Sequence, residues 1–205
     1  MSRKFILVFF ALLNLCIHCK AQLKYTKGYI ILLSGDTLFG SVRSVDSRIP
    51  VKVWFKESEG KEKKYRADKI KGYSISGILN YVTIRDLDEG PFFARIIIND
   101  NLMLLASSWN CGRYYLGTNY SGPDNKILND AIRKSRFFLL HVNKNSTHKI
   151  NQLFFKEDMT EYFSDYSDLQ RMIMNKELRY ADIEIIVKKY NEWFSKSSSS
   201  KIQKD

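Results

Sequence analysis

The stretch YIILLSGDTLFGSV, residues 29–42, decides the fold of this chain. Its two halves are rich in β-branched and other apolar residues, which favour extended backbone. Between them, Ser34-Gly35-Asp36 supplies the residue types that tight turns require. The pattern predicts a β-hairpin, so we expect the folded part of the chain to begin with antiparallel strands.

Further strand patterns follow this hairpin as far as residue 142. The segments with such a pattern are 51–56, 80–85, 92–98, 102–106, 113–116 and 137–142. The polar loop Asn99-Asp100-Asn101 lies between two of them and predicts a second hairpin. Seven or eight short strands at this spacing predict a curled antiparallel β-sheet, either barrel-like or sandwich-like.

The hydrophobic periodicity changes near Phe154. Segments 157–163 and 167–177 lack proline and glycine, and their apolar residues recur at intervals of three and four. The clearest helical stripe consists of Ile183, Ile186, Val187, Tyr190 and Phe194. We expect two or three C-terminal helices that pack on the sheet. The predicted class is α+β.

The chain from residue 22 to residue 194 is of a size that suits one domain. We expect a β-rich body over 22–150 and a helical end over 151–194. Residues 195–205, with a run of serines and several lysines, have too little apolar surface to order themselves, and they predict a flexible basic tail.

Residues 1–21 have the three parts of a secretory signal. Arg3 and Lys4 make the start positive, residues 5–17 form an apolar run, and Cys19-Lys20-Ala21 places small residues three and one before the cut. The run is shorter than the ~20 residues of a membrane-spanning helix. We therefore expect cleavage near Ala21-Gln22 and a periplasmic or cell-envelope location. An uncleaved N-terminal anchor is the alternative.

The cysteines bear on both processing and stability. Cys16 and Cys19 follow Leu15 and His18, not the small residue that lipoprotein processing needs, so a released protein is expected. Loss of residues 1–21 leaves Cys111 alone, which excludes an internal disulfide and favours a small buried side chain. No other segment is long and apolar enough to cross a bilayer, so no transmembrane segment is expected after processing.

Positive charge is the one global feature that points towards a partner. The net charge is +11, and it falls to +8 once residues 1–21, which hold three basic residues and no acidic one, are removed. The candidate patch for an anionic partner consists of Lys61, Lys63, Lys64, Arg66, Lys69 and Lys71. Export argues against nucleic acid, which leaves a lipid headgroup or an acidic polysaccharide. A merely solvated pair of strands is the alternative.

Catalytic and metal-binding patterns are weak. The sequence lacks the serine-hydrolase, zinc-protease and phosphate-loop motifs, and no cofactor is expected. Asp86, Asp88 and Glu89 lack the further oxygen ligands of a calcium loop. The two histidines outside residues 1–21, His141 and His148, are too few for a usual zinc site. An exported hydrolase would have to assemble its site from His141, His148, Asp86 and Asp88.

Three stretches carry a resemblance to other proteins. They are AQ (21–22) followed by KGYIILLSGDTLFGSV (27–42), then FFARIIINDNLMLLASS (92–108), and finally FFKEDMTEYFSDYSDLQRMIMNKELRYADIEIIVKKYNEWF (154–194). The chain resembles small secreted or periplasmic proteins of Bacteroidota-type bacteria whose function is unknown. The resemblance implies an envelope location and a β-rich body with a helical end, but no catalytic residue. Asp36-Thr37-Leu38 also resembles the site at which such bacteria attach O-glycans, although a tight turn explains these residues equally well.

Together these patterns favour a non-enzymatic binding or interaction module of the cell envelope. Its partner would be another envelope protein or an anionic envelope surface. The hydrolase with a site assembled from distant residues is the alternative function.

Overall fold

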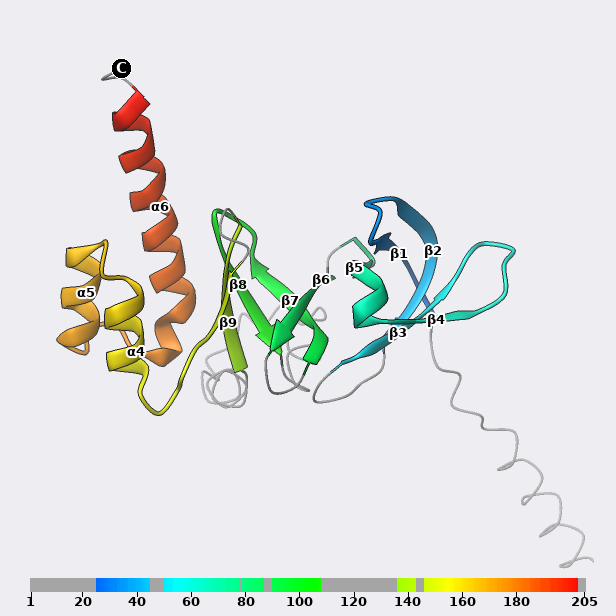
Figure 1. Cartoon of the computed structure of the whole chain (residues 1–205), viewed down its shortest axis with the longest axis horizontal. Helices are drawn as coiled ribbons and strands as arrows, with labels where there is room; N and C mark the ends of the chain where they lie inside the picture. The colour runs from blue at the N-terminus through cyan, green and yellow to red at the C-terminus, as the bar shows by residue number, and fades with distance from the viewer. Residues whose placement is uncertain are drawn as a thin grey trace, which may run out of the picture.

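The architecture comes from a computed structural model that describes residues 25–44, 50–77, 79–86, 90–107, 136–142 and 146–202. Figure 1 shows an elongated molecule, with β1 to β4 at one end and the helices at the other. The strands between β5 and β9 join the two ends. The predicted signal, residues 1–21, lies outside the described residues, as do Cys111 and the strand expected at 113–116.

The described residues form a single antiparallel sheet of ten strands. Their order in the sheet is β10-β9-β8-β7-β6-β5-β1-β2-β3-β4. The strands are β1 (Thr26–Leu32), β2 (Thr37–Ser44), β3 (Lys52–Lys56), β4 (Lys63–Arg66), β5 (Ile70–Ile75), β6 (Leu79–Asp86), β7 (Gly90–Ile98), β8 (Leu102–Ser107), β9 (Arg136–His141) and β10 (Ser146–Lys149). The sheet is open, because β4 and β10 each pair on one side only.

The first half of the sheet curls around its own core. After the meander β1–β4 and the 3-10 helix η1 (Ala67–Lys69), β5 returns to pair with β1 on the side away from β2. The backbone N–H of Phe93 in β7 donates to the carbonyl of Pro50, just before β3, which brings β7 across the open side of this curl. The enclosed core consists of Ile30, Val42, Val53, Phe55, Ala67, Ile70, Tyr73 and Phe93.

Strands β6 and β7 form a wall shared by two cores. Because side chains alternate across a strand, Tyr81 and Phe93 face the first core. Ile84, Phe92 and Ala94 face a second core, where they meet Met103, Leu105 and Phe138. The edge strand β10 lies against β6 around this second core. One continuous sheet therefore curls twice, and neither curl closes.

The helices cover the opposite face of β8 and β9. They are α4 (Phe155–Tyr162), α5 (Ser167–Met174) and α6 (Ile183–Ile202), with the 3-10 helix η2 (Tyr180–Asp182) before α6. The predicted stripe of α6 is buried at Ile183, Ile186, Val187 and Tyr190, against Leu102, Leu104 and Leu139 of the sheet. Since both faces of β8 are covered, all its residues are buried.

The α+β class and the helical end are confirmed, and the finer prediction needs correction. The predicted antiparallel sheet is also confirmed, but the described residues form one open sheet of ten strands and not a barrel-like or sandwich-like sheet of seven or eight. β4, β5 and β10 are additional strands, and His148 lies in β10. α6 also continues to Ile202, into the expected flexible tail, because no proline or glycine interrupts it.

Candidate functional site

The six predicted cations do not form one patch. Lys61 precedes the edge strand β4, which contains Lys63, Lys64 and Arg66, while Lys69 lies in η1 and Lys71 in β5. The strand alternation places Lys64 and Arg66 on the face opposite to Lys63. Lys63 pairs in register with Phe55, on the side of the first core. The segment that looks uniformly basic in sequence is therefore divided between two faces.

The structure instead gathers cations from three strands on the outer face of β2, β3 and β4. Val53 and Phe55 point into the first core, so their neighbours in β3 point outwards. We name this surface the cationic face, and its members are Arg43, Lys52, Lys56, Lys64 and Arg66. Only Lys64 and Arg66 belong to the patch predicted from sequence.

Trp54 lies at the centre of the cationic face. The sheet register aligns it with Arg43 on one side and with Lys64 on the other. The Arg43 guanidinium carbon is 4.9 Å from the centre of the indole ring, and the Lys64 ammonium nitrogen is 5.4 Å from it. These are cation–π distances, so the ring holds two positive charges beside each other on the surface.

Two acidic residues neutralise part of this charge. Glu62 lies 3.3 Å from Arg43 and also accepts a hydrogen bond from Tyr25. Burial and that hydrogen bond raise the pKa of the Tyr25 hydroxyl. Asp68 lies 3.2 Å from Arg66 and 3.5 Å from Lys69. Within the described residues, three members of the cationic face make no ion pair. They are Lys52, Lys56 and Lys64.

The histidines proposed for a hydrolase pack against aromatic rings of the helices. The ring of His141 lies edge-on to Tyr190 and Phe194, at 6.2 and 6.3 Å between ring centres. His148 Nε2 is 2.9 Å from Asp158 Oδ1, and its ring is 4.7 Å from that of Tyr162. Each histidine therefore has a place in the packing of the helical end.

The sheet register separates Asp86, one acid of the hydrolase alternative, from His148. Asp86 pairs with Gly90, the first residue of β7. His148 pairs with Leu139 of β9, and the register continues through Leu104 of β8 to Ile98, the last residue of β7. Asp88 lies outside the described residues. Among the residues that the structure describes, the acidic partner of His148 is Asp158.

Asn191 joins a helix to the sheet, a role that no sequence pattern predicted. Its side chain donates to the carbonyl of Leu102 and accepts from the N–H of Leu102, both at 2.9 Å. These two bonds join the middle of α6 to the first residue of β8. The adjacent Tyr190 hydroxyl donates to Asp165 at 2.7 Å, and burial together with this bond raises the Tyr190 pKa well above its usual value. The only sequence signal was the Tyr-Asn pair itself.

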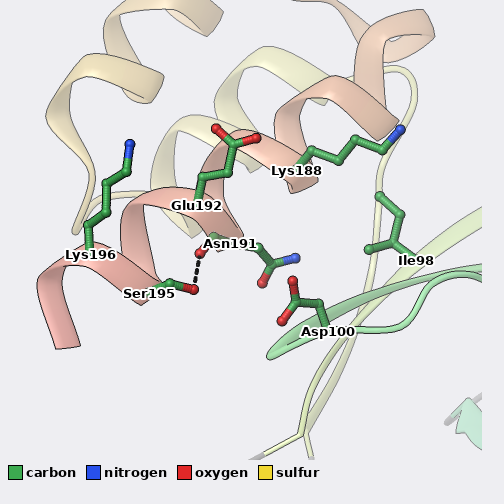
Figure 2. Close-up of a pocket in the computed structure, with 7 residues that line it drawn as sticks. All are labelled: Ile98, Asp100, Lys188, Asn191, Glu192, Ser195 and Lys196. Atoms are coloured by element: carbon green, nitrogen blue, oxygen red, sulfur yellow. Dashed lines mark hydrogen bonds between the residues drawn. The ribbon is translucent and has the colours of Figure 1, made fainter. Parts of the chain in front are cut away.

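A shallow groove of about 400 Å³ runs along this junction. Figure 2 shows Asn191 reaching towards the β7–β8 hairpin that carries Asp100, while Glu192 and Lys196 point away from it. The groove is lined by Ile98, Asp100, Lys188, Asn191, Glu192, Ser195 and Lys196. Its two acids balance its two lysines, and Asn191 already has two partners. The groove is the seam along which α6 docks on the sheet.

A second groove, of about 630 Å³, lies at the start of α4 and the end of α5. Its charged lining has three cations, Lys156, Lys176 and Arg179, and one acid, Glu157. The rest of its lining is Gln152, Leu153, Phe155, Ile173, Leu178 and Tyr180. It is therefore the more cationic of the two grooves.

Two properties of the described ranges bear on metal binding and on membrane insertion. No group of three histidine, cysteine, aspartate or glutamate side chains is close enough to hold a metal ion in that part of the chain. No helix there has both the length and the hydropathy to span a bilayer. The strongest candidate for a functional surface is the cationic face, because five cations from three neighbouring strands converge on it. No known protein family, curated protein sequence or solved structure matches this chain.

Proposed function

We propose that this is an exported cell-envelope protein that acts without catalysis, by binding an acidic polysaccharide through the cationic face. The observation that carries the proposal is the convergence of Arg43, Lys52, Lys56, Lys64 and Arg66 on one outer face of three neighbouring strands. The signal pattern of residues 1–21 and the resemblance to small exported proteins support the location.

The geometry of a sheet gives this charge array a regular spacing. Alternate residues of a strand lie roughly 6.6 Å apart and neighbouring strands about 4.8 Å apart. Lys52 and Arg66 stand directly opposite each other, and like charges in such a position destabilise the sheet. A linear polymer with regularly repeated carboxylates would relieve this repulsion.

The edge position of β4 suggests a different role for its lysines. Charged side chains on an edge strand prevent pairing with another molecule, and this alone would explain Lys63 and Lys64. It does not explain Arg43, Lys52 and Lys56, which lie in interior strands of the sheet. Edge protection therefore accounts for the lysines of β4 alone, whereas binding also accounts for the cations of β2 and β3.

The test uses polygalacturonate, a linear polymer of uronic acids, and the processed protein recovered from the periplasm of an expressing host. We expect the protein to bind the polymer at low salt and to be released by added salt. The double variant K52E/K64E should bind at least about tenfold more weakly, since each reversal removes an attraction and adds a repulsion. The matched control K188E/K196E makes the same charge change on α6 and should bind like the wild type.

Three results would reject the proposal. One is absence of binding by the wild type at low salt. Another is equal loss of affinity in K52E/K64E and K188E/K196E, which would reveal an effect of net charge alone. The third is a K52E/K64E protein that retains the affinity of the wild type for the polymer.

A further inference from the structure

The turn before α4 exposes two consecutive large apolar side chains. Leu153 is 89% exposed and Phe154 is 62% exposed, whereas the next residue, Phe155, is buried in the core of the helical end. We name Leu153 and Phe154 the apolar tip. Adjacent exposed apolar residues of this size mark sites of contact with a protein or a membrane more often than isolated ones do.

The apolar tip is held outwards by a well-bonded turn. The side-chain oxygen of Asn151 accepts from the N–H groups of Leu153 and Phe154, at 3.1 and 3.3 Å. The N–H of Asn151 donates to Asp158 Oδ2 at 2.8 Å, and Asp158 also contacts His148. The turn is thus anchored to both α4 and β10. The same anchoring that buries Phe155 points the two residues before it into solvent.

Cations lie beside the apolar tip. Leu153 lines the second groove together with Lys156, Lys176 and Arg179, against the single acid Glu157. Arg179 Nε donates to the carbonyl of Lys176 at 3.2 Å, which keeps these two residues adjacent. The surface therefore combines an apolar projection with a positively charged border.

We propose that the apolar tip inserts into the interface of a bilayer that contains anionic lipid, with Lys156, Lys176 and Arg179 against the headgroups. A bilayer offers apolar material beneath a layer of negative charge, which matches this surface in both respects. The groove beside the tip offers little uncovered apolar area to a protein partner, because Phe155 and Ile173 in its lining are buried. A second copy of the chain would bring the same cations together, and their repulsion disfavours a symmetric dimer there.

This membrane contact is independent of the cationic face. Figure 1 places α4 and the strands β3 and β4 at opposite ends of the elongated molecule. Because the apolar tip precedes α4, the cationic face lies at the far end of the molecule from it (Figure 1). The two surfaces can therefore be disabled one at a time.

The test measures co-sedimentation of the processed protein with vesicles made of equal parts phosphatidylcholine and phosphatidylglycerol. The variant L153S/F154S should bind at least about tenfold more weakly, because it removes the apolar area that enters the interface. The matched control L33S/F39S changes two strongly exposed apolar residues of the β1–β2 hairpin and should bind like the wild type. Vesicles of phosphatidylcholine alone should bind the wild type more weakly, since the headgroups then carry no net charge.

The outcomes separate this proposal from the proposed function. L153S/F154S should keep its affinity for polygalacturonate, and K52E/K64E should keep its affinity for vesicles. Vesicle binding that is absent in the wild type, equal in L153S/F154S, or lost only in K52E/K64E would overturn the membrane proposal. So would a wild-type dimer in analytical ultracentrifugation that L153S/F154S converts to a monomer, because the apolar tip would then be an interface between copies.

Discussion

Replacement of Asn191 by alanine should loosen the attachment of α6 to the sheet. The side chain is 3% exposed and makes two hydrogen bonds of 2.9 Å to the backbone of Leu102. Each bond contributes about 1 kcal/mol net, and each buried backbone group that loses its partner costs about 1–3 kcal/mol. Because water can reach part of the neighbouring groove, we expect N191A to lower the free energy of unfolding by about 2–4 kcal/mol.

Urea unfolding followed by circular dichroism measures this loss. Asn175 gives a matched control, because it is exposed and its side-chain amide donates a hydrogen bond to the exposed Glu177 side chain, at 3.2 Å. N175A should change the free energy of unfolding by less than about 0.5 kcal/mol. The reasoning is refuted if N191A costs less than about 1 kcal/mol, or no more than N175A, with an unchanged denaturant slope.

Three further predictions concern charge, backbone strain and pH. K52E places an opposite charge across from Arg66, so it should raise the free energy of unfolding by about 0.2–1 kcal/mol. The same variant should weaken polygalacturonate binding. A loss of stability would contradict the assigned register. Lys176 has a φ of 63°, a backbone angle that glycine adopts without steric strain. K176G should therefore raise the free energy of unfolding by up to about 1 kcal/mol, as measured in urea. A destabilised variant would show that this turn carries no strain. Burial, with the charge of Asp165, raises the Tyr162 pKa to about 12, so the folded state retains the proton above pH 10. The stability that this proton confers is present below pH 10 and is lost as the pH rises towards 12, so Y162F should flatten the alkaline fall in stability, and an unchanged fall would disprove the assignment.

Local patterns predicted those parts of the fold that depend on neighbouring residues. The first hairpin pairs Ile30 with Leu38, as expected from the turn between them. α6 begins at Ile183 and buries the predicted stripe. In both cases the turn residues and the hydrophobic period lie within one short segment, so the sequence itself contains the information.

Long-range pairing was beyond the reach of the same patterns. β5 pairs with β1, a strand from a much earlier part of the chain, as well as with its sequence neighbour β6. β10 is a short edge strand with polar residues, so its local pattern is weak. The double curl of the sheet depends on which faces of β6 and β7 meet which core. Such contacts between distant segments override the weak local preference of a strand.

The candidate site shows the same limit. Residues 61–71 form a basic segment in the sequence, but the alternation of side chains in β4 divides these cations between two faces of the sheet. Arg43, Lys52 and Lys56 join the cationic face only because β2, β3 and β4 are neighbours. Asn191 was equally hidden, since nothing in a helical pattern indicates which polar residue meets a strand end. A helical polar residue acquires such a role only in the assembled molecule.

The salt dependence of polygalacturonate binding tests the central claim most directly. For the wild type, the logarithm of the association constant should fall linearly with the logarithm of the salt concentration, because bound counterions are released. In K52E/K64E this negative slope should become shallower, by about one for each lysine that contacts the polymer in the wild type. A slope near zero for the wild type, or an identical slope for the two proteins, would contradict binding through the cationic face.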